Sequence, residues 1–407
     1  MQRTPGLKEC VEAMRVCPTQ AEAARMLGVS RHTLYRILRR TRPEEEKLTR
    51  LEEHSLKKQN QALRRDLTAA LEDAERSKRL ADVVAKALDP DTHNLGKVPD
   101  WVASKTPKGV DSEAVSAFML SDLHFGEVIN PAAIDGLNSY NMTIGEMRIG
   151  KFFDNAIRLH RDFFPNLDFR GMVQFWLGDF ISGDIHEELA KTNEKEAIET
   201  VLILSGLLSH GLRKMLNELD GTPVHIAAVV GNHGRTTKKP AHKNKVTSSF
   251  DWLVYKMVQR EFAGDDRVTF AISEGSDIRV RVLNTTFLAT HGDQFKGGSG
   301  ISAQVFPLLL GDHRKRKRSI STGTPYDWML CGHFHRYLPG VSGVMANGSV
   351  CGYNEFAASH NFDYEPPLQS FFVVDSDHGV TFRTGIHLES PEEGWRTQKE
   401  VDFFSGK

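Results

Sequence analysis

The sequence of 407 residues predicts an α/β protein with a small all-α domain at its amino-terminal end. Short apolar runs typical of buried strands recur between residues 113 and 389. Amphipathic stretches at 143–164 and 194–219 lie between some of them, as expected for helical crossovers joining parallel strands. Residues 1–42 are basic and helix-forming instead, which predicts the separate all-α domain.

Composition places the chain among ordinary globular proteins, with 40% hydrophobic and 26% charged residues. No apolar run reaches the roughly 18 residues of a membrane span, and no signal-peptide pattern opens the sequence. Four scattered cysteines form no C-x-x-C pair, which argues against a zinc ribbon or a disulfide framework. We therefore expect a protein of the cytoplasm, in a bacterium or a phage-infected host, with no membrane partner.

Polar residues follow five of the strand-like runs. The first run, residues 117–120, ends at a turn that holds Asp122 and His124. The next four end in the patterns Gly-Asp, Gly-Asn-His, His-Gly and Gly-His-Phe-His, which supply Asp179, Asn232, His233, His291, His333 and His335. Ligands bind beyond the carboxyl ends of the strands in open α/β sheets. Carboxylate, amide and imidazole groups suit a two-metal phosphoester site, in which one carboxylate bridges both ions. One such turn alone is as well explained by a buried polar residue, but five together favour the metal site.

In this order, D-x-H, GD, GNH, H-G and GHxH resemble the calcineurin-like metallophosphoesterase superfamily, over about two-thirds of the chain. The resemblance implies an αββα sandwich, in which two mixed sheets face each other with helices outside. It also implies the ligands: Asp122, His124 and His335 for metal one, Asp179 as the bridge, and Asn232, His291 and His333 for metal two. His233 would face the substrate phosphate and protonate the leaving oxygen, while a metal-activated hydroxide attacks. Mn²⁺ is the preferred ion, and Zn²⁺ or Fe²⁺ also suit such ligands.

The sequence departs from the family pattern after the GNH motif. Many members have an acid there that helps to orient the catalytic histidine, whereas Gly234 and Arg235 follow here. The segment Ser-Gly-Asp-Ile-His-Glu-Glu, after the GD motif, offers substitutes in Asp184, His186 and Glu187. We expect one of these three side chains to be the partner of His233.

Residues 1–42 contain nine Lys or Arg residues and three acids, a net charge of +6. Thr19 with Glu22 forms a capping-box pattern, Gly28 allows a turn, and Ser30 can cap a second, basic helix over 31–40. Two short helices of this kind resemble a Fis-type or transposase-type helix-turn-helix, which implies DNA binding. The alternative is a small helical domain for protein contact. The expected DNA contacts are Arg31, His32, Thr33, Arg36, Arg39 and Arg40.

The intervening segments predict a spacer and a linker. Residues 43–89 have a weak heptad pattern, which predicts a parallel coiled coil and a homodimer, with a single long helix as the alternative. Residues 90–112 are rich in turn formers and predict a linker. The metallophosphoesterase domain is expected over 113–389, and residues 390–407 form a tail.

Two basic runs lie close in sequence to the metal-ligand motifs. One follows His233 and the other covers residues 313–318. We expect both to form loops that flank the site and bind the backbone of a polyanion, with ordinary solvated loops as the alternative. The candidate contacts are Arg235, Lys238, Lys239, Arg314, Lys315 and Arg316.

Together these features favour a metal-dependent phosphodiesterase that acts on DNA, a nuclease. The same motifs also suit a small-molecule or protein phosphomonoesterase, or a cyclic-nucleotide phosphodiesterase, tethered to DNA by the helix-turn-helix. A non-catalytic DNA-bound scaffold is a third alternative, although every expected ligand is present. The domain combination resembles proteins of phages and prophages. DNA is the expected partner, and a partner ATPase cannot be read from the sequence.

Overall fold

The computed structural model describes residues 4–39, 113–164, 167–240, 243–296 and 305–389. The chain divides into two compact units, residues 1–83 and 84–407. The expected spacer at 43–89, the linker at 90–112, the tail at 390–407 and Arg40 lie outside the described residues. The coiled-coil dimer therefore stays a prediction.

The first unit contains α1 (Leu7–Val16), α2 (Gln20–Met26) and a further helix over residues 31–39. Both expected caps are present, because the Thr19 hydroxyl accepts from the Glu22 amide at 3.3 Å and that of Ser30 accepts from Thr33 at 3.1 Å. The small core of this unit consists of Cys10, Ala13, Ala23, Ala24 and Leu34. Helix α1, which supplies part of that core, was not predicted from the sequence.

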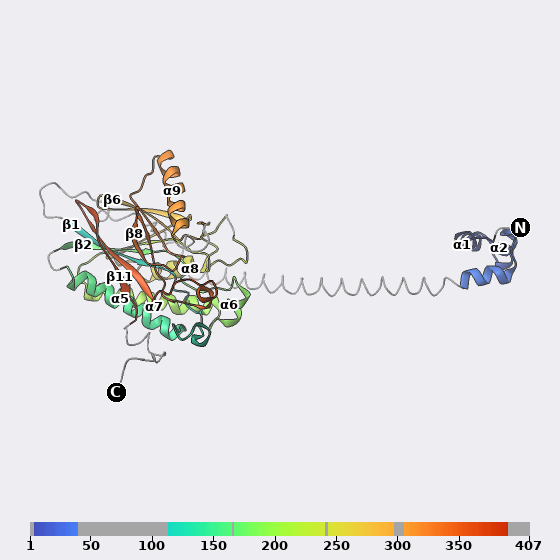
Figure 1. Cartoon of the computed structure of the whole chain (residues 1–407), viewed down its shortest axis with the longest axis horizontal. Coiled ribbons are helices and arrows are strands. Elements are labelled where there is room, and N and C mark those ends of the chain that lie inside the picture. Colours follow the sequence, from blue (N-terminus) through green and yellow to red (C-terminus); the bar gives the residue numbers. More distant parts are fainter. Residues whose placement is uncertain (1–3, 40–112, 165–166, 241–242, 297–304, 390–407) are drawn as a thin grey trace, which may run out of the picture. The chain divides into compact units, whose positions relative to one another are not determined.

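Two sheets form the second unit (Figure 1). The six-stranded sheet has the order β11-β10-β1-β2-β3-β4. Its parallel strands are β1 (Glu113–Leu120), β2 (Asp168–Trp176), β3 (Val224–Ala228) and β4 (Val268–Ile272), and its antiparallel edge is β10 (Leu368–Asp375) with β11 (Gly379–His387). The five-stranded sheet has the order β5-β6-β7-β9-β8, built from β5 (Asp277–Val282), β6 (Thr285–Thr290), β7 (Trp328–Cys331), β8 (Leu338–Val341) and β9 (Val344–Ala346).

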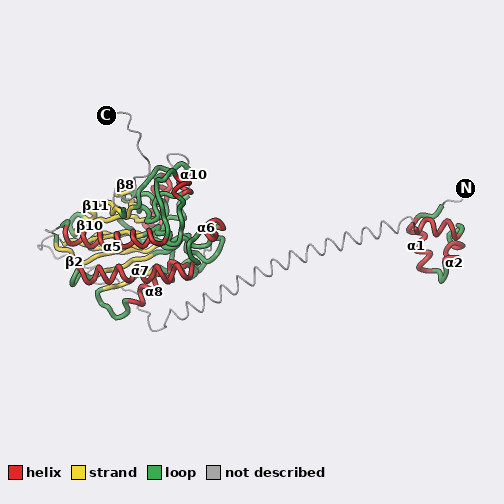
Figure 2. Tube along the Cα trace, turned by 90° about the horizontal axis from the view of Figure 1, so that it is seen from below, coloured by secondary structure: helices red, strands yellow, loops and turns green. Residues whose placement is uncertain are grey.

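The main core lies between these sheets, where apolar side chains of both meet. Phe175 of β2, for example, lies 5.6 Å from Phe287 of β6 between ring centroids. The helices α5 (Met142–Asp162), α7 (Ala197–Glu218) and α8 (Phe250–Glu261) lie side by side over the six-stranded sheet (Figure 2). Helix α9 (Phe306–Ser321) packs against the five-stranded sheet. This mixed α/β arrangement of two facing sheets with helices outside agrees with the predicted fold class.

Shorter elements complete the described part: η2 (Pro131–Ile134), α6 (Glu187–Thr192) and α10 (Glu355–Ser359). Among the helices that the structure describes, none is long and apolar enough to cross a membrane.

One histidine of the core, His225 on β3, makes stability depend on pH. It is fully buried, its Nδ1 lies 2.9 Å from Thr269 Oγ1, and its Nε2 has no hydrogen-bond partner. Burial lowers the pKa of His225 to about 4. Below the ordinary value of 6.5 the unfolded chain therefore binds a proton that the folded chain excludes, and stability is lost as the pH falls from 6.5 toward 4.

Candidate metal centre

Seven potential ligands lie just beyond the carboxyl ends of five strands. The first sheet contributes through β1, β2 and β3, and the second through β6 and β7, each set being parallel. Parallel strands end at one edge of a sheet, so side chains from segments far apart in sequence meet there. The ligands are Asp122, His124, Asp179, Asn232, His291, His333 and His335, all of them buried or half-buried. The structure thus brings together every metal ligand that the resemblance implied.

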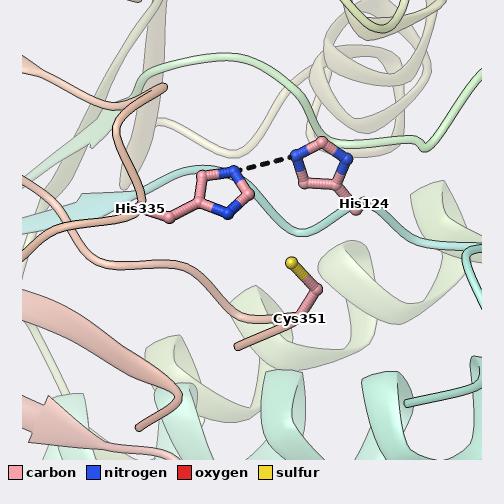
Figure 3. A group of neighbouring side chains, drawn as sticks. All are labelled: His124, His335 and Cys351. Carbon is pink, nitrogen blue, oxygen red and sulfur yellow. Dashed lines mark hydrogen bonds between the residues drawn. The ribbon is translucent and has the colours of Figure 1, made fainter. Parts of the chain in front are cut away.

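One group surrounds His124 and His335. Their Nε2 atoms lie 3.1 Å apart (Figure 3). His335 Nε2 also lies 3.5 Å from Asp122 Oδ1. Burial lowers the pKa of His124 well below its ordinary value, so its imidazole is neutral and has a free electron pair to offer. Burial lowers the pKa of His335, but the Cys351 thiol and the Asp122 carboxylate outweigh this and raise the pKa well above its ordinary value. Two converging imidazoles beside a carboxylate are a donor set for a divalent transition metal.

The second group contains Asp179, His291 and His333, whose donor atoms lie within 4.8 Å of one another. His291 Nε2 is 2.9 Å from Asp179 Oδ2 and 3.1 Å from Asn232 Oδ1. Asp179 also forms a group with His124 and His233 under the same distance limit. The Asp179 carboxylate therefore stands between the two groups, where a bridging ligand belongs.

Backbone geometry marks the same residues. Positive φ is unusual outside glycine and persists only where surrounding structure enforces it. Ten non-glycine residues of the described part have it, and half of them are ligand candidates in this cluster: Asp122 (53°), His124 (44°), Asp179 (53°), His333 (71°) and His335 (50°). Such strain, concentrated at one edge of two sheets, points to a functional site.

Contacts on the far side of the imidazole rings orient two of the ligand candidates. The Nδ1 atom of His291 donates to the Leu177 carbonyl at 2.6 Å, which directs Nε2 toward Asp179. His124 Nδ1 makes no hydrogen bond, but buried Glu127 lies 3.5 Å away and is itself held by Asn354 at 3.1 Å. A carboxylate behind a ligating imidazole is a common support for a metal centre.

Cys351 lies beside His335 with its thiol pointing toward the two imidazole rings, and its sulfur lies within 4.8 Å of a nitrogen of each (Figure 3). The thiol is fully buried, and burial raises its pKa. The loop that carries it is fixed from below, because Arg148 of α5 donates to the carbonyls of Val350 and Cys351 at 2.8 Å.

The electrostatics of the cluster favour a positive charge. Burial lowers the pKa of His291, but the Asp179 carboxylate and its hydrogen bond outweigh this and raise the pKa to about 10. Burial raises the pKa of Asp179, yet the His291 and His233 imidazoles bring it well below its ordinary value. The Asp179 carboxylate thus stabilises a positive charge placed beside it. The carboxylate and imidazole donors of the cluster fit divalent metal ions.

His233 occupies a distinct position beside the cluster. Its amide donates to Asp179 Oδ1 at 2.6 Å, and its ring centroid lies 4.5 Å from that of His124. The Nδ1 atom lies 3.0 Å from the Ser182 carbonyl, which can only accept, so Nδ1 carries a hydrogen and donates it in this hydrogen bond. This tautomer leaves Nε2 with its electron pair.

The partner of His233 is therefore a backbone carbonyl, and the expectation that Asp184, His186 or Glu187 would supply it is wrong for Nδ1. The His186 ring lies 5.7 Å from that of His233, and Glu187 pairs with Lys238 at 3.7 Å instead. A backbone acceptor leaves no trace in the sequence, which explains the error.

A close approach of two turns explains the glycine of the GNH motif. A Cβ placed on Gly231 would overlap the Asp179 carboxylate and lie 2.7 Å from its Cγ. Any side chain at residue 231 would therefore displace the central carboxylate or the turn that carries it.

One carboxylate beside the ligand candidates was not predicted from the sequence. Asp251 is the second residue of α8 and is fully buried. It accepts from the amides of Asp179 and Phe180 at 3.0 Å and of Gly231 at 2.8 Å. Burial, followed by the charge of Asp179, raises the pKa of Asp251 to about 6. Its sequence signal was only that of an acid in the first turn of a helix capped by Ser249.

The basic runs differ from the expectation. Residues 313–318 belong to helix α9 and form no loop. Lys315 is buried and paired with Asp277 at 2.6 Å, while Arg316 bonds Asp312 and the carbonyls of Tyr326 and Asp327.

Arg235 is also engaged, since its guanidinium donates to the carbonyls of Asn232, Thr237 and Lys238. These three cations therefore hold the protein's own chain. Lys238, Lys239 and Arg314 are exposed, and their contact with a substrate stays a prediction.

Comparisons with known proteins identify no family. No protein-family model matches the chain, and no curated protein matches it. Among solved structures, a Vps29 mutant from Entamoeba histolytica is 12% identical, over 66% of this chain and 98% of that one, with a TM-score of 0.25. A dimetal phosphatase from Danio rerio is 12% identical over 68% and 99%, with a TM-score of 0.28. SoxB, a sulfate thiohydrolase from Thermus thermophilus, is 10% identical over 69% and 57%, with a TM-score of 0.27. Likenesses this slight carry no argument about activity, which is inferred below from the site.

Proposed function

We propose that the second unit is a metal-dependent phosphoesterase that hydrolyses phosphodiester bonds of DNA with two divalent metal ions, Mn²⁺ by preference. The convergence of seven donor side chains at one edge of the two sheets, with Asp179 between the two groups, carries the proposal. Asp122, His124 and His335 would hold one ion, Asn232, His291 and His333 the other, and Asp179 both. Such ions supply an activated water and neutralise charge on a phosphate.

His233 is placed to donate a proton during the reaction. The Ser182 carbonyl fixes Nδ1 as a donor, so the ring cannot turn freely and Nε2 keeps one orientation. A histidine half-buried beside the cluster can give a proton to a leaving oxygen when protonated at Nε2, or steady its charge by a hydrogen bond.

The first unit supports DNA as the substrate. Arg31, His32, Arg36 and Arg39 are all exposed on the helix over residues 31–39, as contact with phosphates and base edges requires. Tyr35 is exposed among them, with the Arg39 guanidinium 5.9 Å from its ring centroid.

Thr33 is the exception on this helix, because it is half-buried and its hydroxyl lies 2.9 Å from that of Ser30. We therefore expect Thr33 to contribute less to DNA binding than its exposed neighbours, although its place near the start of the helix still suits contact with the phosphate backbone.

Hydrolysis assays on three substrates test the function. The full chain with Mn²⁺ is incubated with labelled DNA, with bis(p-nitrophenyl) phosphate and with p-nitrophenyl phosphate, and Asp179→Asn serves as the control for contaminating enzymes. We expect cleavage of DNA and of the diester that Asp179→Asn abolishes. Turnover of the monoester alone would replace the nuclease by a phosphomonoesterase tethered to DNA. No control-sensitive turnover of any substrate would leave a non-catalytic DNA-bound protein.

A further inference from the structure

Asp251 joins two turns that both carry metal-ligand candidates. Its Oδ2 accepts from the amides of Asp179 and Gly231, and its Oδ1 accepts from Phe180. The first turn follows β2 and presents Asp179, whereas the second follows β3 and presents Asn232 directly after Gly231. One rigid carboxylate therefore sets the distance between the central ligand and a ligand of the second group.

The chain leaves space for this carboxylate. A Cβ on Gly234 would lie 2.8 Å from Asp251 Oδ1 and 2.9 Å from its Cγ, closer than carbon atoms normally approach. The carbonyl of Gly234 also accepts from the Phe250 amide at 2.6 Å, which fastens the loop to the start of α8. The absence of a side chain at Gly234 therefore leaves the space that the Asp251 carboxylate occupies.

Helix α8 holds Asp251 in place and offsets part of the cost of its burial. Ser249 is the N-cap of α8, which begins at Phe250, and the Ser249 hydroxyl accepts from the Asp251 amide at 3.3 Å. An acid in the first turn of a helix also benefits from the helix dipole. Three amide donors and this dipole suit an ionised carboxylate better than any neutral side chain of the same size.

We propose that Asp251 is the positioning residue of the metal centre, which keeps the Asp179 turn and the Asn232 turn at the separation that metal binding needs. It touches neither substrate nor metal and acts through the backbone of the ligands. The proposal rests on the metal centre put forward above.

Asp251→Asn tests the carboxylate with almost no change in shape. An asparagine has one acceptor oxygen, so its amide nitrogen must face at least one of the three backbone donors. Asp312→Asn is the matched control, because Asp312 is also a buried acid on a helix and accepts from Tyr326 at 2.8 Å and from Arg316 at 2.7 Å. Those partners belong to α9 and the segment before β7, and none is a ligand candidate.

Three measurements on the full chain separate positioning from general stability. Hydrogen exchange of the chelator-treated protein reports the amides of Asp179, Phe180 and Gly231 without any metal. Equilibrium dialysis gives the Mn²⁺ affinity, and kinetics with bis(p-nitrophenyl) phosphate give kcat and KM. Thermal melting of both variants measures the loss of stability.

We expect Asp251→Asn to speed exchange at these amides at least about tenfold and to weaken Mn²⁺ binding roughly 10–100-fold, as loss of a support behind metal ligands does. In the diester assay kcat should fall with little change in KM, and added Mn²⁺ should restore part of the rate. Asp312→Asn should melt at a lower temperature than wild type but keep wild-type exchange at these amides and wild-type Mn²⁺ affinity.

Wild-type Mn²⁺ affinity and amide exchange in Asp251→Asn would overturn the proposal. If that variant does not fold, Gly234→Ala answers the question, because its Cβ presses on an intact Asp251. That variant should weaken Mn²⁺ binding too, and unchanged affinity would be equally contrary. A wild-type chain that binds Mn²⁺ but cleaves no phosphoester would refute the proposed activity alone, since exchange and dialysis still report on Asp251.

Discussion

Gly231→Ala is the change that most directly probes the packing of the metal centre. The new Cβ would lie 2.7 Å from Asp179 Cγ and overlap the carboxylate oxygen in front of it. Carbon atoms prefer separations of about 3.5–4.0 Å, so the two turns must part by about 1 Å. Because Asp179 stands between both ligand groups, the displacement affects both proposed ions.

The expected result is a large loss of activity from one methyl group. A misplacement of about 1 Å costs on the order of 10²-fold in rate where reacting groups must be aligned. We expect kcat for bis(p-nitrophenyl) phosphate to fall at least about 100-fold and metal content to fall below that of wild type. Both are measured on the same preparation, by kinetics and by elemental analysis after dialysis.

Gly206→Ala is the control for this substitution. Gly206 lies within α7, and a Cβ there meets nothing within 4 Å. Alanine should stabilise the helix by about 0.5–1 kcal/mol and leave activity unchanged. If Gly231→Ala kept its metal and turned over like wild type, the close approach of the two turns would be unnecessary for the site and the reasoning refuted.

Three further predictions concern proton transfer, stability and the first unit. His233→Ala should lower kcat by about 10²–10⁴-fold while both metals stay bound, and metal loss would make His233 a ligand. Between pH 7 and pH 5 the free energy of unfolding should fall by about 2 kcal/mol less in His225→Phe than in wild type, because the pKa of His225 lies at about 4 in the folded chain. Urea unfolding at both pH values checks this, and an unchanged difference would contradict it. Deletion of residues 1–42 should weaken DNA binding and reduce its salt dependence in binding titrations, whereas identical salt slopes would exclude DNA contact by this unit.

The clustering of these ligand candidates could be predicted from sequence because each of them lies within a few residues of the end of a strand. The residue type and its place after an apolar run are both local features, and the parallel order of the strands then brings their ends together. The helix caps at Thr19 and Ser30 were predictable for the same reason.

The supports of the ligands could not be predicted, since they come from other elements. Asp251 reaches its turns from α8, Asn354 holds Glu127 from more than 200 residues away, and Ser182 acts through its backbone. Residues 313–318 of α9 were expected to form a loop because charged Lys315 and Arg316 interrupt the apolar pattern of its inner face. Their salt bridges with Asp277 and Asp312 explain how these charges are tolerated there.

The most direct test of the account is the number and coupling of bound metal ions. Metal-free protein is titrated with Mn²⁺ and followed by electron paramagnetic resonance and by diester hydrolysis on the same samples. We predict two ions per chain, a spin-coupled signal that Asp179→Asn abolishes, and activity that appears with the second ion. A single uncoupled ion, or activity that is complete without metal, would contradict the two-metal centre.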